Sequence, residues 1–249
     1  DATQSTVGKT SSTAPKGKTT GSPSSSSAVP AYAPTASPRN SFLAPPAVDL
    51  IHSGSEPRVI IIDLETTGFS PTKDRVIQLA AMVMPSIHEH DGGRAARTGT
   101  TNTNMAVQDY FNAFVRPRGA SISPAVQDLT GISQAFVEAE GVSFGDAWAD
   151  FIAWLQDVPG DGPVVLLAHN GKSFDFNFLQ AELNRSGKEG LCTYVDCLVD
   201  TLHVVRDPSL WEDGPLTKPD AFGLAVLYKH VTATLPANSH NALFDVMAL

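Results

Sequence analysis

The pattern of apolar residues divides the chain near residue 57. Residues 1–56 show no strand or helix period, whereas short apolar runs begin directly after them. The runs 58–63, 76–83 and 110–115 are rich in Val, Ile, Ala and Phe, which is typical of buried strands. No helical period separates these runs, and 86–109 is polar and predicts a long loop. We therefore expect an antiparallel meander.

Helical signals begin after the meander. Ser123 followed by Pro predicts a helix start, and Gly131 predicts its end. Ser143 opens a capping-box pattern, with apolar residues on one face of the helix that follows. The other expected elements are a strand at 163–168, a helix at 176–185, an ambiguous segment at 195–205, a helix at 219–230 with Phe222, Val226 and Leu227 inward, and a last helix starting near Ser239. Helices and strands that alternate after a meander predict an α/β fold with a mixed sheet.

Composition separates a tail from a folded domain. Residues 1–56 contain 19 Ser or Thr and 7 Pro, so this segment buries too little apolar surface to fold. Residues 2–48 hold no acidic residue, as in transit peptides, but a single Arg and no amphipathic period favour a disordered tail. Residues 57–249 are long enough to fold alone. The chain stops inside an apolar helical pattern, so we expect its C-terminal helix to be truncated.

Net charge, the length of apolar runs and cysteine content exclude several classes of protein. The chain has a formal charge of −9, and residues 57–249 carry 13 basic and 23 acidic residues, a net charge of −10. Proteins that bind duplex nucleic acid typically present basic patches. An acidic domain does not fit this pattern unless metal ions bound to its carboxylates reverse the local charge. No apolar run approaches the ~18 residues of a membrane span. Cys192 and Cys197 are interpreted as ordinary thiols.

Two acidic residues end the first predicted strand. Asp63 and Glu65 are two positions apart, so both carboxylates point to one face while Leu64 points into the core. Ionised carboxylates held together repel each other unless a cation lies between them, and oxygen ligands favour Mg²⁺ or Mn²⁺ over zinc. An Asp-x-Glu sequence alone is weak, because solvated acids at a strand end give the same pattern.

Two further acidic residues are candidates for the same site. Asp175 opens the helix after the fourth predicted strand, where a helix cap is the alternative interpretation. Asp245 follows His240 by five residues, which places them on different faces of one helix. The two converge only if His240 lies in the loop before the helix and Asp245 in its first turn. His240 would then be a general base, with a surface or capping His as the alternative.

Taken together, these residues resemble the DEDDh exonucleases of the ribonuclease-H-like superfamily. The motifs are Asp63–Phe69, His169-Asn170 with Phe174–Phe176, and His240–Asp245. The resemblance covers about 58–249 and implies an α/β, ribonuclease-H-like mixed five-stranded sheet with helices on both faces. Residues 168–183, which include Gln-Ala-Glu-Leu, are most similar to the three-prime repair exonucleases of animals. Gly214-Pro215 before Phe222 agrees with the same subgroup.

The resemblance also implies roles for individual residues. Asp63, Glu65, Asp175 and Asp245 would hold two Mg²⁺ ions, for which Mn²⁺ can substitute, and His240 would deprotonate the attacking water. The implied substrate-binding residues are Leu64, Thr66, Phe69, Ile132, Asn170 and Phe174. Of these, Phe69 and Ile132 would stack on the terminal nucleotide, with a core position as the alternative for each. Backbone amides near Leu64 and Thr66 would hold the 3′-hydroxyl.

The expected function is metal-dependent 3′-5′ exonuclease activity that releases nucleoside 5′-monophosphates from DNA 3′ ends, as in DNA repair. An RNA 3′-trimming enzyme with the same site, a silent nucleic-acid-binding module and a scaffold that acts through the tail are the alternatives. Expected partners are single-stranded DNA or DNA 3′ ends, with RNA as an alternative, and no membrane. A homodimer is a further possibility of this family. The compartment is left open between nucleus, cytoplasm and mitochondrion.

Overall fold

A computed structural model of the chain describes residues 55–84, 110–212, 216–236 and 239–249. The expected loop at 86–109, the Gly214-Pro215 pair and nearly all of the expected tail at 1–56 lie outside these residues. In the described part, no helix is long and apolar enough to span a membrane.

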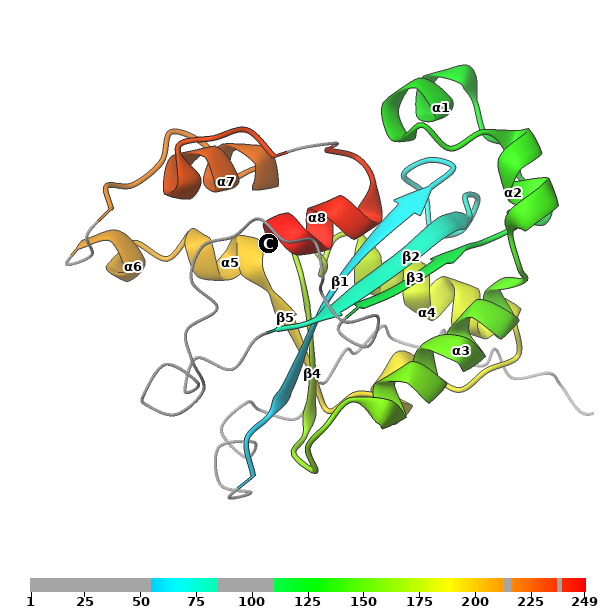
Figure 1. Cartoon of the computed structure of the whole chain (residues 1–249), viewed down its shortest axis with the longest axis horizontal. Coiled ribbons are helices and arrows are strands. Elements are labelled where there is room, and N and C mark those ends of the chain that lie inside the picture. The colour runs from blue at the N-terminus through cyan, green and yellow to red at the C-terminus, as the bar shows by residue number, and fades with distance from the viewer. Residues whose placement is uncertain (1–54, 85–109, 213–215, 237–238) are drawn as a thin grey trace, which may run out of the picture. The chain divides into compact units, whose positions relative to one another are not determined.

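A five-stranded mixed sheet forms the centre of the described part (Figure 1). Its order is β3-β2-β1-β4-β5, in which β1–β3 are antiparallel neighbours and β1, β4 and β5 are parallel. The strands are β1 (Arg58–Thr66), β2 (Val76–Val83), β3 (Tyr110–Phe114), β4 (Val164–Ala168) and β5 (Cys197–Asp200). The predicted meander and mixed sheet are therefore confirmed.

β1 carries the acidic motif at its end, as predicted, and pairs with β2 as far as Thr66. The pairing register shifts between Glu65 and Thr66. The ambiguous segment 195–205 contains both alternatives, since β5 ends at Asp200 and helix α5 (Thr201–Val205) begins at the next residue. Asp200 caps that helix by accepting the N–H of Leu202.

Local capping explains where several helices begin and end. The remaining helices are α1 (Pro124–Thr130), α2 (Gln134–Glu140), α3 (Phe144–Asp157), α4 (Asp175–Arg185), the 3-10 helix η3 (Leu191–Thr193), α6 (Ser209–Glu212), α7 (Leu224–Thr232) and α8 (Ala242–Ala248). The Ser123 cap and the left-handed Gly131 enclose α1 as predicted. The capping box of α3 is also confirmed, because Ser143 accepts the N–H of Asp146 and donates to its carboxylate.

Other helix predictions were less accurate. The sequence pattern did not predict α2 or α6, and α7 begins at Leu224 rather than 219. Val226, expected to point inward on that helix, is 42% exposed. The last helix, α8, begins at Ala242, three residues after the predicted start, because the side chain of Asn241 caps it.

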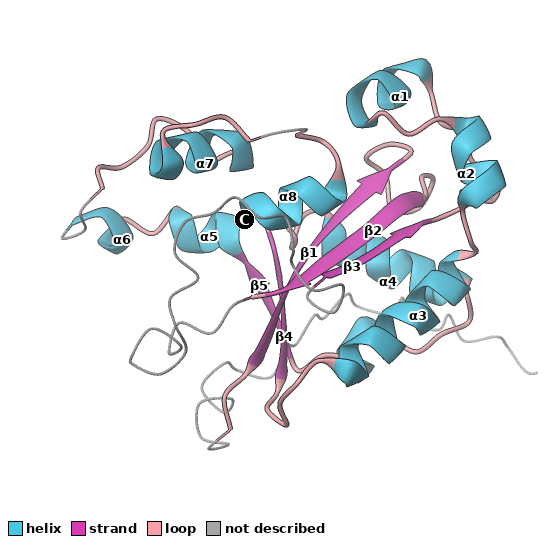
Figure 2. Cartoon of the chain, viewed as in Figure 1, coloured by secondary structure: helices cyan, strands magenta, loops and turns pink. Residues whose placement is uncertain are grey.

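Helices cover both faces of the sheet (Figure 2), as predicted. One face packs against α3 and α4, where Trp148, Phe151 and Phe178 are fully buried. The opposite face of β1 and β2 packs against α8, whose Ala242 and Val246 are also buried. The alternation along β1 thus sends Ile60, Ile62 and Leu64 to the α3 and α4 face, and Asp63 and Glu65 to the other. These contacts place the acidic end of β1 beside α8.

Candidate active site

The carboxylates at the end of β1 meet a third carboxylate from α8. One carboxylate oxygen from each of Asp63, Glu65 and Asp245 lies within 4.8 Å of the others. Glu65 is buried, whereas Asp63 and Asp245 are half-buried. The first two come from adjacent same-face positions of one strand, and the third comes from a helix packed against that face. This convergence is what the sequence predicted for these three residues.

The start of α8 determines how His240 and Asp245 are placed. His240 lies before the helix in the left-handed region, with φ of 67°, and its backbone N–H donates to Oδ2 of Asp245 at 2.9 Å. Asp245 lies in the first turn of α8. The condition set from the sequence for their convergence is therefore met. The imidazole of His240 is on an exposed residue beside the carboxylates, where water reaches it.

Asp175 lies next to this group but is buried more deeply. It is 2% exposed at the first position of α4, and its Oδ1 has no hydrogen-bond partner in the described part of the chain. The backbone N–H groups of Asp175 and Leu64 hydrogen-bond its carboxylate. Because β4 is parallel to β1, the segment after β4 returns to the acidic end of β1. Asp175 is not among the three residues whose ligand atoms lie within 4.8 Å.

Burial raises the pKa of all four carboxyl groups, and repulsion by neighbouring site carboxylates adds to the shift for Asp63 and Glu65. Burial, followed by the charge of Asp245 and then Asp175, raises the pKa of Glu65 to about 8. Burial raises the pKa of Asp175 to about 7, although hydrogen bonds from backbone N–H groups oppose the shift. The pKa of Asp63 is raised well above its usual range, and that of Asp245 is also raised, in each case by burial first. A metal-free site therefore retains protons that a cation would displace.

The donor set fits divalent metal ions. The site offers only carboxylate oxygens, which hard cations such as Mg²⁺ prefer. The unpartnered Oδ1 of Asp175 adds a buried acceptor without a donor, and such an atom destabilises the fold unless something binds it. A cation would bind this atom and relieve the repulsion that contributes to the raised pKa of Asp63 and Glu65. Asp63, Glu65, Asp175 and Asp245 are the residues that would hold it.

The predicted substrate-binding residues have different environments. Phe69 is 87% exposed in the loop between β1 and β2, and its ring lies 6.3 Å from that of Phe174, centre to centre. Ile132 is only 4% exposed and packs with Ile77 and Val137, which favours the core alternative left open for it. Asn170 is exposed, with φ of 63°, between β4 and α4. The structure thus groups Phe69 and Phe174 but not Ile132.

Leu64 and Thr66 are both buried, so their contribution to a ligand site would come from the backbone. The N–H of Leu64 is directed to Asp175, and the hydroxyl of Thr66 donates to the carbonyl of Gly68. A role of these two residues in binding a 3′-hydroxyl stays a prediction.

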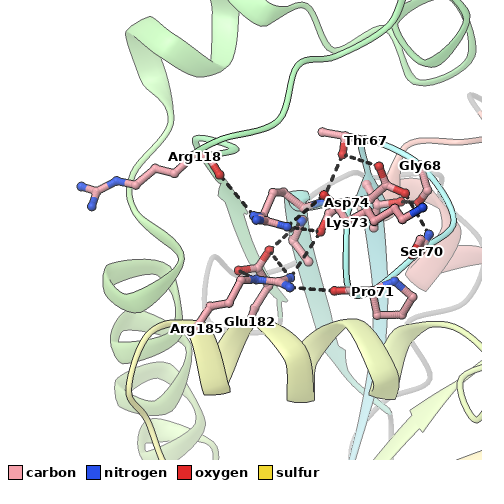
Figure 3. A network of polar contacts seen from close by, with 12 residues as sticks. Thr67, Gly68, Ser70, Pro71, Lys73, Asp74, Arg118, Glu182 and Arg185 are labelled. Carbon is pink, nitrogen blue, oxygen red and sulfur yellow. Dashed lines mark hydrogen bonds and ion pairs between the residues drawn. The ribbon is translucent and has the colours of Figure 1, made fainter. Parts of the chain in front are cut away.

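A polar network fixes the loop that carries Phe69 (Figure 3). Glu182 of α4 is buried; its Oε1 accepts the N–H of Val76 and pairs with Arg185 at 3.0 Å. Arg185 also donates to the carbonyls of Pro71 and Asp74. At the other end of the loop, Asp74 accepts the N–H of Ser70 at 2.9 Å, and its carboxylate lies where a Cβ on Gly68 would be. Asp175 and this network therefore share one helix as their support.

Sequence reasoning missed the buried Gln78 of β2. Gln78 lies opposite Glu65 in the sheet, and its Oε1 accepts the N–H of Ala242 at the start of α8. Its Nε2 donates to Asn112 and contacts Asn241 at 3.5 Å. The amide of Gln78 thereby joins β2 to β3 and to the helix that supplies Asp245. The only signal in the sequence was a polar residue within an otherwise apolar predicted strand.

His169 and Asp200 support the turn before Asp175. The side chain of Asp200 accepts the N–H groups of Asn170 and Lys172, at 2.9 and 3.1 Å. The two ring nitrogens of His169 contact Thr201 Oγ1 and the carbonyl of Phe222, and burial lowers the pKa of this His. His169 was in a matched motif, but the sequence indicated no role for either residue.

Comparison with known proteins agrees with this geometry. A family profile described as Exonuclease, of the RNase T type, matches residues 60–249. The chain belongs to this exonuclease family. The resemblance that the motifs indicated is thereby confirmed, and the divalent-metal dependence of the family agrees with the acidic site.

Curated relatives include three-prime repair exonuclease 1 of Bos taurus, which is 31% identical over 203 residues, covering 77% of this chain and 61% of the relative. The human protein of that name is 30% identical over 198 residues, with the same coverage. Exonuclease DPD1, chloroplastic/mitochondrial, of Arabidopsis thaliana is 31% identical over 196 residues, covering 77% of this chain and 53% of the relative. The chain thus spans about three fifths of the length of the first two relatives and about half of the third.

Solved structures support the fold. A complex of E. coli exonuclease I with single-stranded DNA aligns with a TM-score of 0.59 at 23% identity, covering 78% of this chain and 38% of that chain. Exonuclease I of Methylocaldum szegediense aligns with a TM-score of 0.58 at 18% identity, with the same coverage of each chain. The predicted ribonuclease-H-like fold class is therefore confirmed.

Proposed function

We propose that this chain is a metal-dependent 3′-5′ exonuclease that releases nucleoside 5′-monophosphates from DNA 3′ ends. The observation that carries the proposal is the meeting of Asp63, Glu65 and Asp245 within 4.8 Å, beside the buried Asp175, whose Oδ1 has no hydrogen-bond partner among the described residues. Bound Mg²⁺ ions would supply Lewis-acid stabilisation of the phosphate charge. The named relatives support the direction of digestion and DNA as substrate, because two of those cited are three-prime repair exonucleases.

The chain's own residues would orient the reactants and move the proton. His240 is exposed at the edge of the carboxylate group, and its backbone is tied to Asp245, so its imidazole can accept a proton from the attacking water. Phe69 offers an exposed aromatic face for the terminal base, with Phe174 beside it. Stacking on an aromatic ring tolerates any base, which suits an enzyme that removes successive nucleotides.

A gel assay on the full chain tests this proposal. The substrates are 5′-labelled single-stranded DNA and RNA of one sequence, incubated with Mg²⁺ or with EDTA. We expect stepwise shortening of the DNA that requires Mg²⁺ and is lost in Asp245→Asn. Faster shortening of the RNA would replace DNA by RNA as the substrate. A folded protein that shortens neither strand would refute the exonuclease and support a binding module.

Two secondary expectations belong with this proposal. A homodimer could form through β3, which is at one edge of the sheet and offers free backbone groups. Light scattering after size-exclusion chromatography distinguishes the monomer from the dimer. An organelle location is supported by the Arabidopsis relative, whose name includes chloroplastic/mitochondrial. A fluorescent fusion of the natural full-length protein tests the compartment against nucleus and cytoplasm.

A further inference from the structure

A group of cations lies at the same end of the meander as the acidic motif. Lys73 and Arg75 close the loop between β1 and β2, whereas Arg116 and Arg118 follow β3. The pairs β1–β2 and β2–β3 are both antiparallel, so the C-terminal ends of β1 and β3 lie beside the N-terminal end of β2. Nε of Arg75 donates to the carbonyl of Arg118 at 3.2 Å, which joins the two segments. We call these four residues the arginine patch.

The charge of the arginine patch is only partly neutralised. Glu138 pairs with Arg116 at 3.5 Å, and Asp74 uses its carboxylate within its own loop. Arg75 donates to the carbonyls of Lys73, Asp74 and Arg118, which carry no net charge. Throughout the described ranges, no carboxylate forms an ion pair with Arg75 or Arg118. This surplus is notable in a domain with a net charge of −10.

The geometry of the arginine patch suits an anion at the surface. A hollow of about 510 Å³ is lined by residues 116–121 and Glu138. Arg116 is held beside it by bonds from Nη2 to the carbonyls of Gly141 and Glu138, at 2.7 and 3.2 Å. Arg118 is exposed, and Figure 3 shows its guanidinium pointing away from the polar network. Guanidinium groups bind phosphate through paired N–H donors, so a phosphate is the matching ligand.

The arginine patch also lies within reach of the carboxylates. Backbone bonds join Thr67 to Arg75, and Thr67 is two residues beyond Glu65. With a rise of ~3.3 Å per residue, ~4.8 Å between strands and the length of an Arg side chain, the guanidinium groups lie roughly 10–20 Å from Glu65. At ~3.4 Å per nucleotide in a stacked strand, this span corresponds to about three to six nucleotides.

We propose that the arginine patch binds backbone phosphates of the strand being shortened, about three to six nucleotides from its 3′ end. The proposal rests on the exonuclease function proposed above. A strand whose 3′ end lies at Asp63, Glu65 and Asp245 runs past the exposed positive charge of Lys73 and Arg118 and the hollow beside Arg116. Phosphate contacts of this kind fix the register of a strand without reading its sequence. They also offset the unfavourable field of an acidic domain on a polyanion.

The test compares two charge-matched double variants. Lys73→Gln with Arg118→Gln removes two exposed cations of the arginine patch, and Lys188→Gln with Lys229→Gln removes two exposed cations elsewhere. The first measurement is the ratio of kcat/KM on a 20-nucleotide DNA to kcat/KM on a dinucleotide, which is too short to reach the patch. The second is the slope of log Kd against log salt for the 20-nucleotide strand in EDTA, where no turnover is expected.

In the patch variant we expect the ratio to fall about 10-fold and the salt slope to fall by about 1.4, because each single-strand phosphate contact contributes ~0.7. The control variant should retain the wild-type ratio and slope. Equal ratios and equal slopes in the two variants would overturn the proposal. Hydrolysis of the dinucleotide by the wild-type chain tests the exonuclease function separately, and the binding slope still decides on the patch if hydrolysis is absent.

Discussion

Replacement of Glu65 by Gln should stabilise the metal-free protein while it abolishes activity. Glu65 is buried among three other carboxyl groups, and its pKa is raised from 4.5 to about 8. A group with a raised folded-state pKa stabilises the fold fully below its unfolded pKa, and this stabilisation is lost as pH rises through the folded pKa. Metal-free wild type should therefore lose stability between about pH 4.5 and 8. Gln has nearly the same shape and does not titrate.

The pKa shift of Glu65 determines how much the substitution should stabilise the metal-free protein. A change from 4.5 to about 8 corresponds to about 3.5 pKa units, or about 5 kcal/mol at ~1.36 kcal/mol per unit. The four carboxyl groups titrate together, so the neighbours of Glu65 absorb part of this difference. We therefore expect Glu65→Gln to be more stable than wild type by about 2–3 kcal/mol at pH 8. For a domain of this size, that difference raises the melting temperature by roughly 5–10 °C. Added Mg²⁺ should stabilise wild type more than Glu65→Gln, because it binds the charges that the variant lacks.

Thermal unfolding followed by circular dichroism from pH 5 to 8.5, in EDTA and in Mg²⁺, measures both effects. The control is Glu140→Gln, which removes an exposed carboxylate from α2. In EDTA, the advantage of Glu65→Gln should be large at pH 8 and shrink toward pH 5. An unchanged or lower melting temperature at pH 8, or an advantage that is the same at both pH values, would refute a raised pKa of Glu65 in the folded protein.

Three further predictions concern the support of the site. Phe69→Ala should change the free energy of unfolding by less than about 0.5 kcal/mol, since the ring is exposed, yet lower kcat/KM on single-stranded DNA about 5- to 100-fold through lost stacking; equal kinetics would exclude Phe69 from the substrate site. Gln78→Leu leaves the N–H of Ala242 without its acceptor, so urea titration should show a loss of about 1–3 kcal/mol, with lower activity as Asp245 shifts; full activity would show that α8 keeps its place without this bond. Glu182→Gln should lower stability by about 1–3 kcal/mol because Arg185 loses its charged partner, and it should raise KM more than it lowers kcat; an unchanged KM would separate the loop from substrate binding.

Local patterns were sufficient for much of the fold. The β-branched runs indicated β1 and β2, and the Ser caps with Pro124, Gly131 and Asp146 marked the helices α1 and α3 correctly. These signals succeed because they depend on residues within one turn or one strand. Residues 195–205 could not be assigned to one element because their two halves differ. The first half pairs with β4 as a strand, whereas the second half forms a helix with no buried residue.

Contacts between distant residues lie outside what local patterns can predict. The N–H of Ala242, at the start of α8, donates to the side chain of Gln78, 164 positions away. The helix or strand propensity of neighbouring residues carries no information about such a contact. The same reason explains why Gln78 had no predicted role, although it touches the helix that carries Asp245.

Local features were sufficient to identify the chemistry of the site: which acidic residues are present, their alternation on one strand and their place in recognisable motifs. Three features became known only from the folded chain: Asp63, Glu65 and Asp245 meet within 4.8 Å, Asp175 is buried with no partner for Oδ1 among the described residues, and Ile132 lies in the core. Residue identity and spacing specify donors and faces, whereas distance and burial arise from packing between strands and helices far apart in the chain.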